Sequence, residues 1–172
     1  TYNVAYKFFN LLVIAYTIIL SPMWNAYTDA YIKGDIKWID QTFNRALKLW
    51  LLSVCGGIVM LFGCQYFYHI WIGNKVLVPF TVSLSTFIYV SFFNLNNCVT
   101  YLINGLNKIF VQIITSLAFT ALYIMSVFTI GGKLGIEGIV LCMAGSYAMM
   151  SLIHLYQCWL LVNGKAKGIW NK

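Results

Sequence analysis

Five long stretches of apolar residues, joined by short polar connectors, limit what this chain can fold into. They cover about 8–27, 47–71, 76–102, 110–130 and 136–162. An α-helix needs about 20 apolar residues to cross a hydrocarbon core of roughly 30 Å. Backbone groups in lipid must be hydrogen-bonded internally, so runs of this length are expected to be helices. The alternating pattern of barrel strands does not occur. The sequence predicts an all-α integral membrane protein with five transmembrane helices.

The composition favours the same class. The chain is 61% hydrophobic and 9% charged, whereas a soluble domain has about 25% charged residues. The five cysteines are scattered singly through apolar runs, with no C-x-x-C motif, so no metal site or cofactor is predicted. Four acidic residues and two histidines lie far apart, without a D-x-D pair. An enzyme such as a glycosyl- or acyltransferase needs converging groups, so no catalytic residue is expected.

The distribution of lysine and arginine predicts the orientation of the helices. Three basic residues lie on one side, namely Lys7, Lys75 and Lys133. Eight lie on the other, namely Lys33, Lys37, Arg45, Lys48, Lys108, Lys165, Lys167 and Lys172. Because basic residues in short loops mark the cytoplasmic side, the first helix should run from outside to inside, with a cytoplasmic C-terminus. The net charge of +7 then reflects contact with anionic lipid headgroups rather than with nucleic acid.

An amphipathic helix is predicted at about 36–46, ahead of the second apolar stretch. Ile36, Ile39 and Phe43 recur at spacings of three and four, and charged residues fill the opposite face. Asp35 follows Gly34 and is placed to cap this helix. We expect the helix to lie in the headgroup plane and to continue into the next span. The alternative is a solvated connector with no role in substrate binding.

Four motifs in order along the chain resemble the C-terminal half of bacterial polysaccharide flippases. These are the O-antigen and capsule repeat-unit translocases of the multidrug/oligosaccharidyl-lipid/polysaccharide exporter superfamily. The stretch "SPMWNAYTDAYIKGDIKWIDQTFNRALKLW" (21–50) resembles the cytoplasmic loop after the second helix of that half, through Pro22, Trp24, Tyr27, Ala30, Gly34, Asp35 and Trp38. The other three motifs are "TYNVAYKFF" (1–9), "YLINGLNKIFVQ" (101–112) and "GIEGIVLCMAGSY" (135–147).

The resemblance implies that the five spans are the last five of a twelve-helix transporter. The chain starts at Thr1 inside an apolar run, so we expect a fragment of a single membrane domain, with the N-terminal half and one more helix missing. The implied activity is the flipping of undecaprenyl-diphosphate-linked oligosaccharides across the bacterial inner membrane. Alternatives are a peptidoglycan-precursor flippase, a drug exporter driven by a coupling ion, or a membrane assembly subunit that transports nothing.

Polar residues within spans are candidates for the substrate cavity, because they are costly in lipid. Asn97, Thr100 and Asn104 share one helical face, and their amides and hydroxyl suit sugar hydroxyls. Ser151 and His154 lie one turn apart in the last span. A histidine there could titrate or hold a diphosphate. For all five, the alternative is hydrogen bonding between helices.

Two further candidates, Asn25 and Asp29, lie one turn apart at the predicted cytoplasmic end of the first span, after a bend at Pro22. Asp29 could meet a substrate hydroxyl or a cation, or it could pair with Lys33 across one turn. Pro79 could supply a second bend. No lysine or arginine lies at mid-depth. Basic charges for a diphosphate must therefore come from other helices, or from His154.

Overall fold

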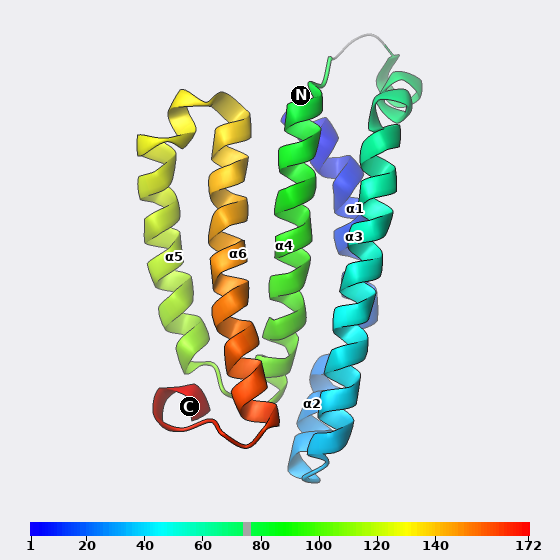
Figure 1. The fold of residues 1–172 in the computed structure, drawn as a ribbon. Coiled ribbons are helices and arrows are strands. Elements are labelled where there is room, and N and C mark those ends of the chain that lie inside the picture. The colour runs from blue at the N-terminus through cyan, green and yellow to red at the C-terminus, as the bar shows by residue number, and fades with distance from the viewer. Residues whose placement is uncertain (74–76) are drawn as a thin grey trace.

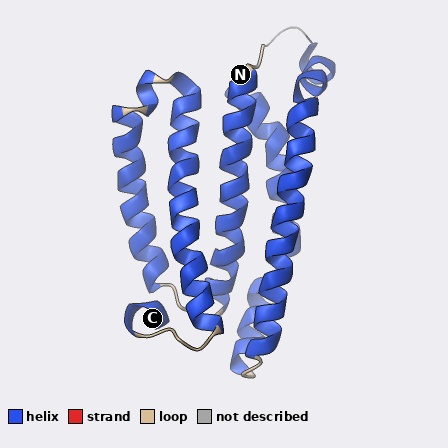
Figure 2. Ribbon diagram, in the orientation of Figure 1, coloured by secondary structure: helices blue, strands red, loops and turns tan. Residues whose placement is uncertain are grey.

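The computed structural model describes residues 1–73 and 77–172. Within them the regular structure is helical and no strand occurs (Figure 2), which confirms the all-α prediction. The long helices run up and down between two ends of the molecule (Figure 1). They are α1 (Tyr2–Leu20), α2 (Met23–Ile32), α3 (Ile36–Ile72), α4 (Phe80–Gly105), α5 (Phe110–Thr129) and α6 (Gly135–Val162). Two short 3₁₀ helices, η2 (Gly131–Lys133) and η3 (Gly168–Asn171), complete the fold.

The first predicted span, 8–27, corresponds to α1 and α2 together. The break falls at Ser21 and Pro22, where proline has no N–H to donate to the preceding turn. Both residues keep right-handed helical backbone angles. The interruption is therefore a local break, and the continuous apolar stretch runs over Tyr2–Ile32.

The predicted amphipathic helix 36–46 and the predicted span 47–71 form one continuous helix, α3. Gly34, with φ +71°, ends the preceding helix in the left-handed conformation that glycine adopts without strain. The Asp35 carboxylate then accepts a hydrogen bond from the backbone N–H of Trp38 at 3.0 Å. The expected N-cap is therefore present, and it fixes where α3 begins.

Helix α4 is the centre of the bundle. It contacts α1, α2, α3 and α6, whereas α5 packs mainly on α6. It begins after Pro79, so that proline starts the helix and does not bend it. The predicted span 76–102 starts at a residue outside the described ranges, and α4 ends three residues later than predicted, at Gly105. The spans predicted at 110–130 and 136–162 differ from α5 and α6 by one residue at a single end.

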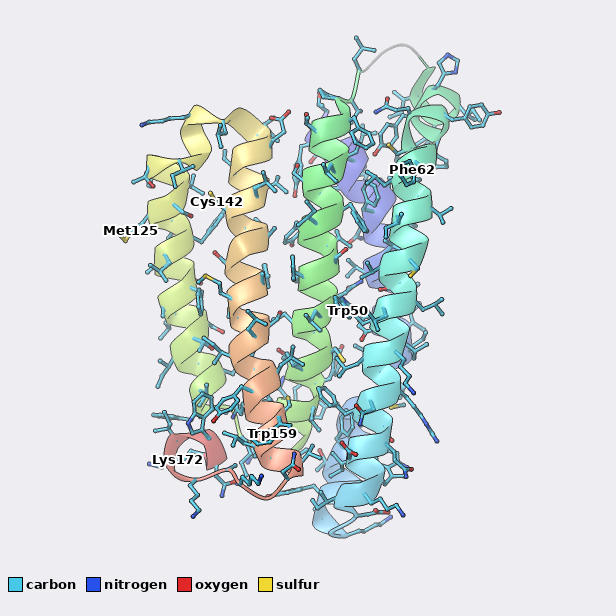
Figure 3. All side chains as sticks on the ribbon, in the orientation of Figure 1. Trp50, Phe62, Met125, Cys142, Trp159 and Lys172 are labelled. Carbon is cyan, nitrogen blue, oxygen red and sulfur yellow. The ribbon has the colours of Figure 1, made fainter. Side chains whose placement is uncertain are left out.

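Among the residues that the structure describes, four helical stretches are long and apolar enough to cross a membrane, namely Tyr2–Ile32, Ile36–Ile72, Phe110–Thr129 and Gly135–Val162. Helix α4 is not among them. Large apolar side chains cover the outer faces of the bundle: Phe62 on α3 is 81% exposed and Phe128 on α5 is 82% exposed. Met125 likewise points away from the neighbouring helices (Figure 3). A surface of this kind suits lipid, because apolar patches this extensive are rare on soluble monomers.

The basic residues are sorted by the fold as the sequence predicted. The α2–α3 turn, the α4–α5 turn and the C-terminus lie at one end of the molecule (Figure 1). The eight basic residues expected to share a side lie at or near that end. Lys7 and Lys133 lie towards the other end, and Lys75 is outside the described residues. The structure thus shows that the described basic residues gather at one end of the molecule. That this end is cytoplasmic stays a prediction.

Candidate functional site

The buried polar residues are concentrated on α4. Ser83, Ser85, Thr86, Asn94 and Asn96 are all buried there. Neighbouring helices supply partners: the Asn94 side-chain amide donates to the carbonyl of Leu12 at 3.4 Å, and the hydroxyls of Tyr68 and Ser83 lie 3.1 Å apart. The Trp50 indole N–H donates to the carbonyl of Ser91 at 2.8 Å, and Figure 3 shows that side chain between α3 and α4. The polar sequence of α4 is thus matched to its central position.

His154 joins three helices through its two ring nitrogens. Nδ1 lies 3.2 Å from Oδ1 of Asn96 on α4, and Nε2 lies 2.8 Å from the hydroxyl of Thr115 on α5. An amide oxygen only accepts, so a neutral imidazole satisfies this arrangement when Nδ1–H donates to Asn96 and the Thr115 hydroxyl donates to Nε2. His154 is completely buried. In this conformation both nitrogens are engaged within the protein, and the side chain is closed to a ligand.

Ser151 is part of the same contact between α4 and α6. It is buried, and its hydroxyl donates to the carbonyl of Tyr147 at 2.7 Å and lies 3.5 Å from the carbonyl of Phe92. Ser151 and His154 therefore share one environment, as their spacing suggested. That environment is the interior of the bundle.

Asn97, Thr100 and Asn104 form a half-buried stripe along α4, hereafter the α4 stripe. The Thr100 hydroxyl is buried without a hydrogen-bond partner among the described residues. Residue 97 points about 100° away from residue 96 around the helix. The α4 stripe consequently lies beside the face that contacts His154 and is separate from it.

Asn25 and Asp29 lie in a third environment, on α2 at the basic end of the molecule. Both side chains are exposed. Asp29 lines a shallow pocket whose other lining residues are Ala26, Ala30, Lys33, Asp35 and Trp38. The seven candidate residues thus occupy three places: the surface of α2, the α4 stripe and the α4–α6 interior.

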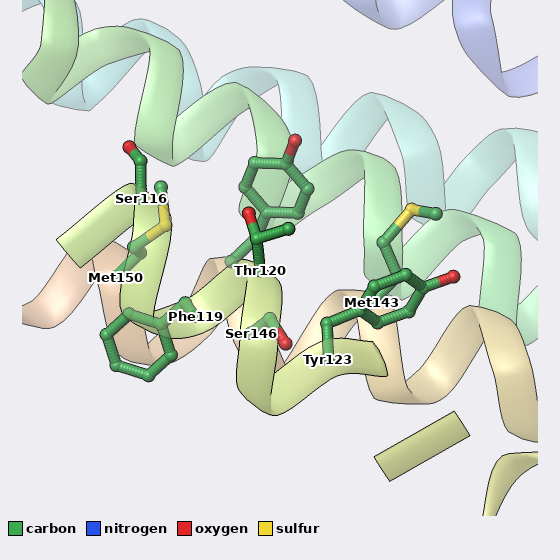
Figure 4. Close-up of a pocket in the computed structure, with 8 residues that line it drawn as sticks. Ser116, Phe119, Thr120, Tyr123, Met143, Ser146 and Met150 are labelled. Carbon is green, nitrogen blue, oxygen red and sulfur yellow. The ribbon is translucent and has the colours of Figure 1, made fainter. Parts of the chain in front are cut away.

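A pocket of about 230 Å³ lies between α5 and α6 (Figure 4). Its lining residues are Ser116, Phe119, Thr120 and Tyr123 from α5, and Met143, Ser146, Tyr147 and Met150 from α6. Five of these eight side chains carry a hydroxyl. Thr115, which contacts His154, is adjacent to Ser116, so the pocket begins where the buried Asn96–His154–Thr115 contact ends.

Several of these residues were not predicted from the sequence. Asn96 was not among the predicted candidates, and its role depends on where α6 packs. The hydroxyls of Ser116, Thr120 and Tyr123 recur at spacings of four and three in a mostly apolar helix. That spacing was the available signal, because it places them on one face.

No protein-family model, no curated protein and no solved structure matches the chain. The function is therefore argued from the arrangement of the side chains, and the resemblance to flippases stays a prediction.

Proposed function

We propose that the chain is the C-terminal part of a twelve-helix flippase that moves undecaprenyl-diphosphate-linked oligosaccharides to the outer leaflet of the bacterial inner membrane. In this proposal α4 also spans the membrane, in addition to the four stretches that are apolar enough to do so by themselves. Its lower hydropathy is tolerated because α1, α2, α3 and α6 surround it. One observation carries the proposal: uncharged polar side chains gather on the α4 stripe and in the α5–α6 pocket, while the outer faces of α3 and α5 are apolar.

The chemistry of these polar groups suits a sugar. A half-exposed amide at membrane depth is costly unless it meets water or a polar ligand. Asn97 and Asn104 each offer a donor and an acceptor, and between them the buried Thr100 hydroxyl has no partner among the described residues. Sugars present many hydroxyls and no charge. The α4 stripe is therefore suited to the oligosaccharide, and the diphosphate requires basic groups on other helices.

The basic end supports the proposed placement in the membrane. Three of its lysines follow α6, and four basic residues lie in or next to the first turns of α3. Anionic headgroups of the cytoplasmic leaflet attract such residues. With this end cytoplasmic, membrane lipids are partners of α3, and Asn25 and Asp29 lie at the mouth through which a substrate or a coupling ion enters.

The proposal is tested by export of repeat units from cells that lack their own flippase and carry the full-length protein. We expect wild type to restore export. Asn97→Leu should lower export at least tenfold at an unchanged amount of protein in the membrane. Asn163→Leu is the matched control, because that exposed asparagine lies beyond α6 and its amide bonds to the carbonyl of Trp159. Normal export by Asn97→Leu would assign the α4 stripe to packing, and failure of inserted wild-type protein would reject the flippase function.

A further inference from the structure

We propose that the pocket between α5 and α6 binds one neutral sugar ring of the cargo, and we call it the ring pocket. The aromatic side chains of the pocket would stack on one face of the sugar ring, and its hydroxyls would form hydrogen bonds with the hydroxyls of the sugar. This inference rests on the proposed function and names the part of the cargo that the pocket receives. It is carried by the distribution of hydroxyls on α5, by the fixed aromatic wall and by the size of the pocket.

Helix α5 has two unlike sides. Ser116, Thr120 and Tyr123 line the ring pocket. Exposed apolar residues flank this stripe and cover the rest of the outer surface of α5, among them Ile113, Leu117, Ile124, Met125 and Phe128. A helix that met only lipid away from α6 would gain nothing from three hydroxyls on one stripe. The stripe therefore indicates a polar ligand on that side.

The hydroxyls of α5 also differ in their hydrogen bonds. Outside the ring pocket, Ser126 and Thr129 each donate to a carbonyl of their own helix at 2.8–2.9 Å. Within the described part of the chain, the hydroxyls of Ser116, Thr120, Tyr123 and Tyr147 have no such partner, and only Ser146 in the pocket is bonded, to the carbonyl of Cys142. The free hydroxyls are those that face the pocket, which leaves them available to a ligand.

The α6 wall of the pocket is fixed before any ligand arrives. The ring of Tyr147 packs edge-on against Phe93 of α4, with centroids 5.3 Å apart and planes at 82°. It also lies 5.8 Å from the ring of Tyr89. A wall held in this way costs little entropy to order on binding. Figure 4 shows Phe119 and Tyr123 on the α5 side of the pocket.

Size and charge restrict the ligand. At about 230 Å³ the pocket is smaller than the roughly 300–1,000 Å³ of sites for drug-sized ligands, so it suits a single ring. No acid, lysine, arginine or histidine lines it, which excludes the diphosphate as the group recognised there. Phe93, which supports Tyr147, is one helical turn from Asn97 of the α4 stripe. A sugar chain could therefore extend from the pocket to the stripe.

The test is photo-crosslinking of the full-length protein in lipid nanodiscs with an alkyl maltoside that carries a diazirine on its sugar. We expect labelling within 110–129 and 135–162, and competition by excess unmodified maltoside. The double variant Thr120→Val, Tyr123→Phe keeps the shape of the pocket and removes two hydroxyls. Each lost hydrogen bond should weaken binding about two- to tenfold, so labelling at a subsaturating concentration should fall at least about fourfold. The control pair Thr129→Val, Tyr156→Phe removes two hydroxyls outside the pocket and should label as wild type.

Three results would overturn the ring pocket. Equal labelling by an alkyl diazirine without a sugar would show that the pocket binds lipid chains and not a sugar. Labelling that neither the competitor nor the double variant reduces would be non-specific. The absence of labelling would mean that another helix, or a second copy of the chain, covers the pocket. The export assay separates the two proposals: wild-type export without labelling rejects the ring pocket alone, and labelling without export rejects the flippase alone.

Discussion

His154 is the residue on which three helices depend. Its imidazole bridges Asn96 on α4 and Thr115 on α5, and every atom of its side chain is away from the surface. In such a place the cost of leaving a partner unsatisfied exceeds the gain from the bond itself. The contribution of His154 to stability is thus coupled to that of Asn96.

This coupling can be measured in a double-mutant cycle. We expect His154→Leu to lower the free energy of unfolding by about 1–2 kcal/mol, because the amide of Asn96 is left buried without its partner. The double variant Asn96→Leu, His154→Leu should recover at least half of that loss, since both polar groups are then gone. Unfolding in detergent micelles with increasing dodecyl sulfate provides the measurement. Additive losses would contradict the bridge.

Neighbouring asparagines on α4 show which residue roles the sequence could indicate. The face shared by Asn97, Thr100 and Asn104 was predicted from spacing alone, and the structure places all three on one half-buried stripe. Asn96, one position earlier, turns towards α6. Helical periodicity separates the two faces, but only the packing of α6 decides which of them is buried.

At the scale of the helices, the start of α3 depends on a single side chain. Asp35→Ala removes the acceptor for the Trp38 N–H and should cost about 0.5–2 kcal/mol of unfolding free energy. Asp40→Ala is the control and should cost less, because within the described part of the chain its carboxylate accepts a hydrogen bond from the exposed side chain of Asn44 alone. Thermal unfolding of the purified variants gives the comparison. Equal losses of unfolding free energy in the two variants would show that the Asp35 cap does not stabilise α3.

Helices α2 and α4 approach closely at Gly105. A Cβ on that residue would lie 2.6 Å from Cβ of Tyr27 and 3.0 Å from the carbonyl oxygen of Trp24. The Thr28 hydroxyl donates to the carbonyl of Gly105 at 2.8 Å across the same contact. Two backbones therefore meet there with no room for a side chain.

We expect Gly105→Ala to destabilise the protein by about 1–3 kcal/mol, because overpacking forces the two helices apart. Gly63→Ala is matched to it: Gly63 is exposed within α3 and an added Cβ meets nothing within 4 Å. That substitution should be neutral or stabilising, since alanine favours helix over glycine. The measurement is the loss of folded protein on heating, followed by size-exclusion chromatography. A Gly105→Ala variant as stable as Gly63→Ala would show that α2 and α4 are not in tight contact.

For the whole molecule, the all-helical fold and the sorting of basic residues to one end followed from apolar run lengths and lysine positions. Which helix lies at the centre of the bundle was not predicted. Run length alone does not show that α4 is central and α5 peripheral; the asparagines and the lower hydropathy of α4 were the available signal. Nor did the sequence predict the pocket between α5 and α6, which requires two helices to pack with their hydroxyl-bearing sides together.

The orientation of the molecule in the membrane is also open to direct measurement. In a background with its cysteines replaced by serine, single cysteines at Lys167 and Lys133 should react differently with a membrane-impermeant maleimide. We expect Lys133→Cys to be labelled in intact cells and Lys167→Cys only after the membrane is opened, because eight basic residues lie at the end of Lys167. The reverse pattern would invert the proposed topology, and labelling of both in intact cells would reject a transmembrane bundle.

The central position of α4 has a consequence for how the protein is made. A translocon admits each segment to lipid according to its own hydrophobicity, and α4 is not among the stretches apolar enough to cross by themselves. Its buried asparagines find their partners on α1, which is synthesised earlier, and on α6, which emerges later. In a nascent chain that ends before Gly135, Asn96 of α4 therefore still lacks its partner on α6. Such intermediates are expected to be retained by insertion factors or degraded, so biogenesis must wait for the last helix.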